Sequence, residues 1–575
     1  MNFKLRALCL LCALCGARFC FSLDREAFSI TTYDLNVQIE PEQHRLGARG
    51  KITLRNDTSA PQKIAVLQIS SSLDWRAIRT AGKMLQFVTQ PYTSDIDHTG
   101  SLSEALVTLP QEVTPKGTID LDIAYEGVIL LDATRLTRIG APEDAARNTD
   151  WDRIESDFTG VRGAGYVAWY PIATDVANLS EGDSVFEALA RWKAREAGAQ
   201  ARFSIKVSSF SGEQPPQLVI DEPACAAINL QMSRFQQESV DCTFHALGDI
   251  VPSFVIGRFG AVNRKSITIY DLPTHAAAAE AYADATEKIA PLIVDWFGPL
   301  RQKAVTADLP DPDAAPFESG AFLATPLSSD SKLTGLVVAH QLTHASLSSS
   351  RPWINEGLAH FAQALYLEQQ KGRQAALDYM TAHRAALKSS DTSGPTAQPE
   401  NDAARSSLIN TNNEQLLRSK ALCVWWMLRD MIGDAALKKA IQAYRPEQDK
   451  DPSYMPRLTA AQTQRDLDWF FDDWVYRDHG LPDFKVESAF SRKTLNNTYL
   501  LTITLENAGT AGAEVPVIIR MPKGESVKRI EVRAKSKTTV RVETPAAPQE
   551  IVVNDGSVPE SRTGDNTFKV EAPQS

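Results

Sequence analysis

The sequence lacks an excess of positive charge. It has 60 Lys and Arg residues against 71 Asp and Glu residues, which gives a net charge of -11 and a pI near 5.5. Nucleic-acid and anionic membrane surfaces are bound through clustered positive charge, and we find no basic patch. The composition therefore argues against a nucleic-acid partner. A hydrophobic content of 43% argues against a disordered chain. A chain of 575 residues is too long to fold around a single hydrophobic core, so we expect three or four domains.

Long hydrophobic runs are also scarce, and the N-terminal one is short. Lys4 and Arg6 precede an apolar run from Ala7 to Leu14, followed by small residues. This pattern predicts a secretory signal peptide over residues 1–22, with a short amphipathic anchor as the alternative. No lipid-attachment motif accompanies it, so we expect an exported protein, periplasmic or extracellular, without a transmembrane segment after cleavage.

Cysteine is sparse, with seven residues in the chain, four of which fall in or beside the N-terminal segment. Cys225 and Cys242 lie in polar, loop-like sequence. In an oxidising compartment they can close a short loop, worth about 3 kcal/mol. Cys423 lies in the apolar run ALCVWWML, and we expect it to be a small buried core residue.

Hydrophobic patterning changes twice along the chain. Residues 28–256 alternate in the manner of short strands, residues from His275 follow a helical period, and alternation returns from Phe484. This order predicts a multidomain α+β protein with a large N-terminal antiparallel β domain (23–262), a helical domain (263–482) and a C-terminal β-sandwich domain with a tail (483–575). The polar stretch 387–407 is expected to be a loop or insertion.

Two histidines four residues apart mark the candidate site. Along LTGLVVAHQLTHASL, a helical stripe runs from Leu333 to Leu347 and includes His340 and His344, which predicts that both imidazoles point inward and can reach one metal ion. Glu356 follows at the start of the next helix and can supply a third ligand, giving one Zn²⁺ per chain. The alternative is two core histidines bonded to carbonyls. One turn after Glu356, His360 is expected at the surface, with a supporting role at the metal as the alternative.

The order of domains, together with the HxxxH spacing, WINEGLAHF, SGAFLATPL and SKALCVWWMLRDMIGD, resembles the M1 family of zinc aminopeptidases of the gluzincin clan. The resemblance covers nearly all of the chain after the signal peptide. It implies a thermolysin-like peptidase domain over residues 263–482, zinc ligands at His340, His344 and Glu356, and a peptide or protein substrate.

Three departures from the family pattern concern catalysis. Gln341 stands where the family has its general-base Glu, and an amide has no basic lone pair for that work. The substrate-binding motif aligns with residues 320–324, where Gly320 and Ala321 match but Leu323 replaces the carboxylate that holds the substrate amine. Arg418 stands where the family has the Tyr that donates to the oxyanion.

The retained ligands and the lost catalytic groups favour an exported, M1-like zinc-binding protein with weak or no peptide hydrolysis. One alternative is an active zinc metallopeptidase with a displaced base, for which Glu318 is the nearest candidate. Another is a scaffold without metal, in which His340 and His344 only pack. The sequence indicates no oligomeric state.

Overall fold

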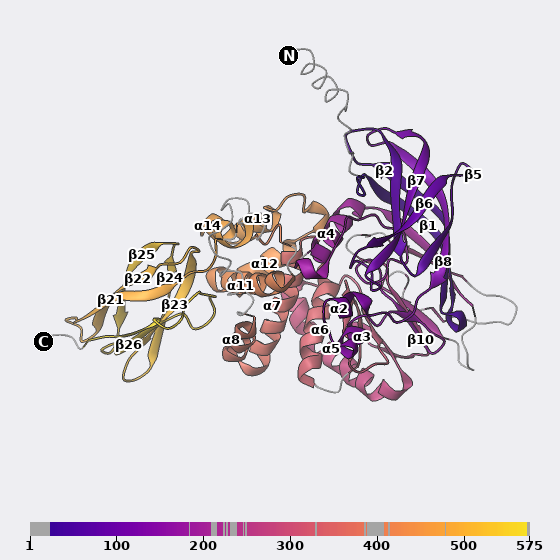
Figure 1. The fold of residues 1–575 in the computed structure, drawn as a ribbon. Coiled ribbons are helices and arrows are strands. Elements are labelled where there is room, and N and C mark those ends of the chain that lie inside the picture. Colours follow the sequence, from indigo (N-terminus) through magenta and orange to yellow (C-terminus); the bar gives the residue numbers. More distant parts are fainter. Residues whose placement is uncertain are drawn as a thin grey trace, which may run out of the picture.

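The computed structural model describes residues 23–571 except 183, 209–215, 222–224, 226–227, 230–238, 245–246, 248–249, 328–330, 384–386, 388–406, 412–413 and 478. The expected signal peptide (1–22), most of the expected loop 387–407 and the last four residues lie outside this range. The protein has a mixed α+β fold, as the sequence predicts, with strands gathered at its two ends and helices between them (Figure 1).

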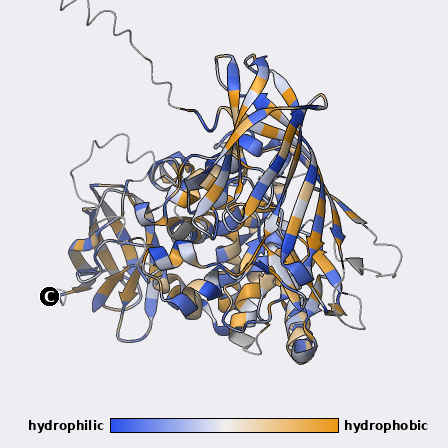
Figure 2. Ribbon diagram, turned by 45° about the vertical axis from the view of Figure 1, so that its right-hand side comes forward, coloured by the Kyte–Doolittle hydropathy of each residue, from blue (hydrophilic) through white to orange (hydrophobic). Residues whose placement is uncertain are grey.

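The N-terminal region is built around a seven-stranded sheet. Its strands run in the order β14 (Ser239–Phe244), β11 (Gln200–Val207), β1 (Phe28–Glu40), β2 (Arg45–Asn56), β8 (Thr118–Val128), β4 (Leu73–Thr80) and β5 (Lys83–Met84). Buried and exposed residues alternate along β1, so one face packs on the core and the other faces solvent, and hydrophobic and hydrophilic colours alternate along these strands in Figure 2. The sheet is not wholly antiparallel, because β1 and β11 run parallel.

Two smaller sheets complete this region. One contains β3 (Gln62–Ser70), β7 (Ser101–Val113) and β6 (Gln86–Thr93), and the other contains β13 (Ile228–Asn229), β12 (Gln217–Ile220), β15 (Phe254–Gly257), β10 (Phe158–Val161) and β9 (Arg153–Ile154). Helices α2 (Thr134–Arg138), α3 (Glu143–Thr149) and α4 (Ser184–Glu196) are inserted between strands. Cys225 and Cys242 form a disulfide here.

A five-stranded sheet begins the central region. Its order is β16 (Gly260–Asn263), β17 (Ile267–Asp271), β18 (Ala304–Asp308), β20 (Phe322–Thr325) and β19 (Phe317–Ser319), with β17, β18 and β20 parallel and β19 an antiparallel edge strand. The helices are α5 (Ala276–Phe297), α6 (Ser331–Ser346), α7 (Pro352–Lys371), α8 (Arg373–Ala382), α11 (Glu414–Ile432), α12 (Asp434–Ala443), α13 (Tyr454–Ala460) and α14 (Asp468–Phe471), the last followed by a π-helical turn over Asp472–Tyr476.

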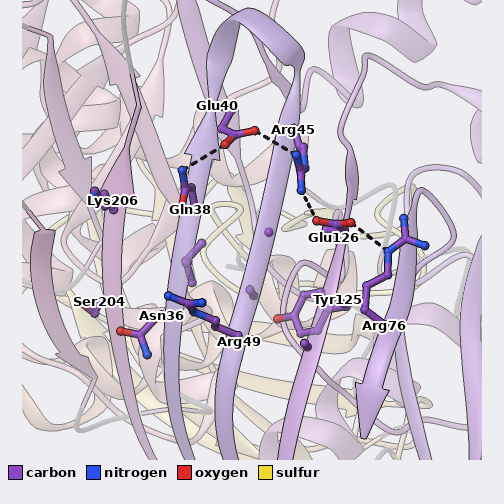
Figure 3. Close-up of a pocket in the computed structure, with 14 residues that line it drawn as sticks. Asn36, Gln38, Glu40, Arg45, Arg49, Arg76, Tyr125, Glu126, Ser204 and Lys206 are labelled. Atoms are coloured by element: carbon purple, nitrogen blue, oxygen red, sulfur yellow. Dashed lines mark hydrogen bonds and ion pairs between the residues drawn. The ribbon is translucent and has the colours of Figure 1, made fainter. Parts of the chain in front are cut away.

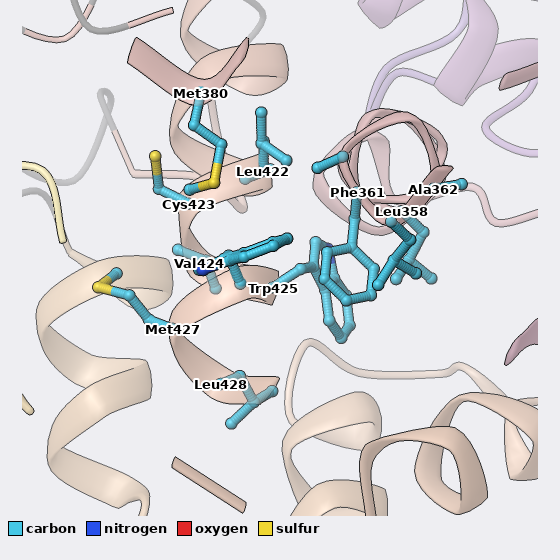
Figure 4. Packing of buried hydrophobic residues seen from close by; sticks show 14 of the residues in the cluster. Leu358, Phe361, Ala362, Met380, Leu422, Cys423, Val424, Trp425, Met427 and Leu428 are labelled. Carbon is cyan, nitrogen blue, oxygen red and sulfur yellow. The ribbon is translucent and has the colours of Figure 1, made fainter. Parts of the chain in front are cut away.

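Helices α7 and α11 are packed unusually closely. A Cβ added at Gly357 would lie 2.6 Å from Cβ of Ala421 and 2.8 Å from Nε1 of Trp425, both on α11. Figure 4 shows Leu358 and Phe361 of α7 beside Trp425 in this core. Only a glycine fits at this crossing, which fixes the helical turn on which Glu356 lies. Cys423 is 2% exposed in the same core, as predicted.

Strands after Phe484 form two facing sheets at the C-terminal end. One contains β21 (Phe484–Lys493), β22 (Tyr499–Asn507) and β25 (Ser536–Thr544), and the other contains β24 (Glu525–Val532), β23 (Ala513–Arg520), β26 (Glu550–Val553) and β27 (Thr567–Lys569). Their inward residues join the same buried cluster as the helices, so this end is packed against the helical region. Among the described residues, no helix is both long and apolar enough to cross a membrane.

Candidate functional site

Helices α6 and α7 bring the predicted ligands together through a short connection. Pro352 opens α7 at a position where its missing N–H costs nothing, and the Asn355 side chain accepts a hydrogen bond from the Ser349 amide at 3.2 Å across the connection. The inward stripe on α6 begins later than expected, because Leu333 is 58% exposed. His340, by contrast, is buried.

Two carboxylates approach the paired imidazoles of His340 and His344. Nε2 of His340 and Nε2 of His344 are 3.2 Å apart. Glu356 reaches both nitrogens with its two oxygens at 3.7 Å, and Glu318 reaches the same nitrogens at 3.1 and 3.3 Å. Zinc bonds of 2.0–2.2 Å in a tetrahedron separate neighbouring ligand atoms by about 3.3–3.6 Å, so the spacing and the donor types fit a zinc ion.

Glu318 is a candidate ligand that sequence reasoning did not place beside the histidines. The sequence suggested it only as a displaced base, whereas its oxygens lie closer to the histidines than those of Glu356. Its group with His340 and His344 can hold a metal ion. It lies on edge strand β19 directly opposite Leu323 of β20, and the antiparallel register places both side chains on one face. The signal that could have found it is this two-strand hairpin around Gly320.

The electrostatics of the cluster keep the Glu356 carboxylate charged. Burial alone would raise the pKa of Glu356, but the positive charges of His344, His340 and Arg418 outweigh burial and lower that pKa to about 2. Burial alone would lower the pKa of His340, but Glu318 and Glu356 raise it instead. In the absence of a metal, Glu356 and His340 therefore each favour the charged form of the other. A zinc ion bound here would take the place of the proton on His340, because a ligating imidazole is neutral.

All hydrogen-bonding groups of the Gln341 side chain are engaged within the protein. Its Oε1 accepts hydrogen bonds from the hydroxyls of Tyr282 at 3.0 Å and Thr306 at 3.2 Å. Its Nε2 donates to the carbonyls of Val305 at 2.9 Å and Ala321 at 3.1 Å. The side chain is 1% exposed, and these bonds use both of its donors and both of its acceptor sites. Gln341 therefore ties α6 to α5 and to the central sheet.

The other two substituted positions differ from each other. Leu323 is buried on β20, where its apolar side chain offers nothing to an ammonium group. Gly320 adopts a left-handed conformation with φ of 58° at the turn into β20, and Ala321 contributes its carbonyl to the Gln341 network. Arg418 lies on α11, is exposed, and its charge lowers the pKa of Glu356, so its guanidinium acts electrostatically on the site.

The expectation that His360 lies at the surface is wrong. His360 is 8% exposed, and its ring centroid is 5.0 Å from that of His340 and 5.6 Å from that of His383. The reason is that this face of α7 packs against α6 and α8, where His340 and Tyr379 contact the ring. Burial and the charges of His340 and Arg418 lower the pKa of His360 well below its usual value, so the ring is neutral.

A chain of hydrogen bonds fixes which His360 nitrogen carries the proton. Gln363 donates from Nε2 to the Leu336 carbonyl at 3.1 Å, so its Oε1 must be the acceptor for the Tyr379 hydroxyl at 2.5 Å. The Tyr379 oxygen then accepts from Nδ1 of His360 at 3.1 Å. A neutral imidazole has one N–H, so Nε2 carries a lone pair, and this buried atom has no hydrogen-bond partner in the described structure.

A hollow lies on the solvent face of the N-terminal sheet, away from the candidate metal site. It has a volume of about 650 Å³ and is lined by charged side chains of β1, β2, β4 and β8. Arg45 pairs with both Glu40 and Glu126, and Arg76 also pairs with Glu126 (Figure 3). The charges of these two arginines and two glutamates offset one another, as is usual on the solvent-exposed face of a sheet.

Comparisons with known proteins give structural matches only. No protein-family model and no curated protein matches the chain. The M1 zinc metallopeptidase from Deinococcus radiodurans matches with 16% identity over 76% of this chain and 91% of that chain, with a TM-score of 0.48. A mutant of that protein matches over 78% and 94% with a TM-score of 0.48, and its complex with a Tyr-Ser-Ala substrate matches with a TM-score of 0.47. At this identity the chemistry has to come from the residues of this chain.

Proposed function

We propose that this chain is a zinc-binding, peptidase-like protein that hydrolyses peptides weakly or not at all. The observation that carries the proposal is the contrast on one helix between His340 and His344, whose ring nitrogens converge with two carboxylates, and Gln341, whose amide is saturated by four hydrogen bonds. A zinc ion supplies a positive charge and, where a coordination position is open, a Lewis acid.

The carboxylate of Glu318 supports a closed site. Structural zinc sites have four protein ligands, whereas catalytic sites have three and keep the fourth position open. Here Glu318 forms a group with His340 and His344 that can hold a metal ion, and Glu356 lies 3.7 Å from both imidazoles as a further donor. If Glu318 fills the fourth position, a substrate carbonyl has no place to bind.

The residues at the remaining catalytic positions agree with this interpretation. Gln341 cannot accept a proton, and Leu323 cannot hold a substrate amine. Arg418 brings a fixed positive charge where a neutral hydroxyl donor would be expected in the M1 family. Loss of a general base alone typically removes about 10²- to 10⁴-fold in rate.

The proposal extends to ligand and compartment. A peptide or protein segment is the expected ligand, because the site resembles one that holds peptides. Export is supported by the signal-peptide pattern of residues 1–22 and by the Cys225–Cys242 disulfide, which persists in oxidising compartments.

A second candidate function is an active metallopeptidase in which Glu318 serves as the base. The observation in its favour is that the Glu318 side chain is 30% exposed beside both histidines, so it can turn toward solvent and leave the metal position open. In that case Glu318→Ala would abolish peptide cleavage while zinc stays bound. Under the leading proposal, the same variant would have no cleavage to lose.

The test is the zinc content of the protein purified without chelator, measured beside His344→Ala, with free and internally blocked peptide libraries assayed on both. We expect one zinc per chain in the wild type, none in His344→Ala, and no turnover. Ordinary turnover by the wild type would overturn the leading proposal. Absence of zinc from the wild type would leave the two histidines as packing residues in a scaffold.

A further inference from the structure

The strand that carries Glu318 is held from the side of the N-terminal region. Phe317, next to Glu318 on β19, packs edge-on against the ring of Tyr166 with centroids 5.6 Å apart. The segment leading into β19 is tied to the same region: the Trp151 indole donates to the Ala315 carbonyl at 2.9 Å, and the Ala315 amide donates to the Asn148 carbonyl at 2.7 Å. Residues 148–166 therefore form a platform under β19.

The platform is rigid because a buried cation lies within it. The guanidinium of Arg162 lies 3.7 Å from the ring centre of Tyr166 and 4.1 Å from that of Trp151. Asp152 accepts a hydrogen bond from it at 2.7 Å, and the Thr149 carbonyl accepts another at 2.7 Å. Both side chains of the ion pair are almost fully buried, so Arg162 is held in place, and a shift of either aromatic ring would lose a buried cation–π contact with it.

The candidate ligands come from separate parts of the fold. His340 and His344 belong to α6 and Glu356 to α7, whereas Glu318 belongs to β19. Pairing with β20 fixes the register of β19, and the platform fixes the sideways position of its N-terminal end. The position of Glu318 relative to the histidines thus depends on contacts that the N-terminal region makes.

We infer that Trp151 and Tyr166 are positioning residues for Glu318, and that a metal ion at this site joins the N-terminal β region to helices α6 and α7. The inference rests on the proposed metal binding and adds that the bound metal has a structural role, which is to link these two parts of the fold. Coupling between two binding events is reciprocal, so docking of the platform tightens metal binding by the same factor by which the metal tightens docking.

The experiment measures zinc affinity on the full chain by competition with a chromogenic chelator, together with the unfolding midpoint of the metal-free protein. Glu318→Gln removes the charge of the proposed ligand. Trp151→Phe keeps an aromatic ring at this position but removes the indole N–H that donates to the Ala315 carbonyl. Trp75→Phe is the matched control, since its indole donates to the Ser103 carbonyl at 3.0 Å within the N-terminal region, away from β19.

Changes around a metal ligand typically weaken binding 10- to 100-fold. We expect at least about a 10-fold loss of zinc affinity for Glu318→Gln and a smaller loss, about 3- to 10-fold, for Trp151→Phe. Trp75→Phe should lower the unfolding midpoint without changing the zinc affinity. A purely structural role for Trp151 would give the Trp75→Phe pattern and would overturn its positioning role.

A second readout avoids any dependence on how Trp151→Phe folds. Zinc should slow hydrogen–deuterium exchange across residues 148–166 in the wild type and leave it unchanged in Glu318→Gln. If His344→Ala loses zinc but Glu318→Gln binds as tightly as the wild type and keeps the slowed exchange, this inference is wrong while the proposed function stands. If the wild type binds no zinc, the proposed function has failed first.

Discussion

Two carboxylates, Glu196 in the N-terminal region and Glu356 in the central region, titrate in opposite directions. Glu196 ends α4 and is 1% exposed. One oxygen accepts the Ile30 amide at 3.0 Å, and the other has no hydrogen-bond partner in the described structure. Burial raises the pKa of Glu196 to about 8. The pKa of Glu356, by contrast, is lowered to about 2 by His344, His340 and Arg418 despite its burial.

The opposite pKa shifts distinguish a buried carboxyl group that the fold holds protonated, Glu196, from one that the fold keeps charged, Glu356. Burial disfavours a carboxylate anion wherever positive charge is distant, and Glu196 shows that result. Around Glu356 the chain has gathered imidazoles whose nitrogens are 3.7 Å from its oxygens. Negative charge at Glu356 is therefore maintained by imidazoles that can also share a metal ion with it, which supports the proposed metal binding at this cluster.

The largest effect is expected from a third carboxylate, introduced by Gln341→Glu. One carboxylate oxygen would still accept from Tyr282 and Thr306, but the other would face the carbonyls of Val305 and Ala321, which the amide now serves as a donor, and no cation would offset the buried charge. We expect a loss of about 3–5 kcal/mol in the free energy of unfolding, measured by denaturant titration, and no gain of peptide cleavage. Gln442→Glu, at an exposed position on α12, is the control. A variant as stable as the wild type that cleaves peptides would show that position 341 still reaches substrate.

Glu196→Gln should change the pH dependence of stability. The folded-state pKa of Glu196, about 8, exceeds the ordinary value of 4.5, so the folded protein holds the extra proton between these pH values. The stabilising contribution of Glu196 is therefore complete below pH 4.5 and is lost as pH rises toward 8. Relative to the wild type, the variant should gain about 3 kcal/mol between pH 5 and pH 8.

Denaturant unfolding of both proteins at several pH values measures this difference, and titrations common to both cancel. Glu187→Gln, on the exposed face of the same helix, is the matched control. If the difference between wild type and Glu196→Gln does not depend on pH, Glu196 is charged in the fold and the contrast with Glu356 disappears.

Glu356→Gln should weaken zinc binding at least about 100-fold, which is about 2.7 kcal/mol. The amide keeps the shape of the side chain but loses the charge that His340 and His344 face. Isothermal titration or chelator competition measures the loss. Glu447→Gln, exposed on a short turn, should bind as the wild type does. Equal affinity in Glu356→Gln would mean that Glu318 alone completes the site.

The smallest effect is expected for Tyr379→Phe, which removes the hydroxyl between His360 and Gln363. Loss of this link should cost about 1 kcal/mol of stability. In long-range ¹H–¹⁵N spectra the wild type should show His360 with its proton on Nδ1, and the variant should show a mixture of tautomers. A proton on Nε2 in the wild type would contradict the hydrogen-bond chain.

Much of this architecture can be read from sequence periodicity, because burial imposes periods of two and 3.6 residues on strands and helices. The His340–His344 spacing predicts two converging imidazoles, and they converge at 3.2 Å. The Cys225–Cys242 disulfide and the buried Cys423 also follow from local sequence. Such local signals specify which face of an element is inside.

What sequence reasoning missed depends on contacts between distant segments. Glu318 reaches the histidines because a hairpin at Gly320 and a platform more than 150 residues earlier place β19. The hairpin is a local signal, but no local pattern carries the contact with the platform. His360 was expected at the surface because its burial arises from α6 and α8, which lie elsewhere in the sequence. Likewise, the substitution at Gln341 signals a lost base, but only the structure gives its four partners.

The glycine after Glu356 has a consequence for how such chains change over evolutionary time. Any side chain at position 357 would collide with Ala421 and Trp425, whether or not the neighbouring carboxylate takes part in a reaction. Selection on packing can therefore preserve the glycine of Asn-Glu-Gly after selection on turnover has ended. A search for active enzymes by this tripeptide would recover inactive descendants too, and the residue after the first histidine is the better guide to which is which.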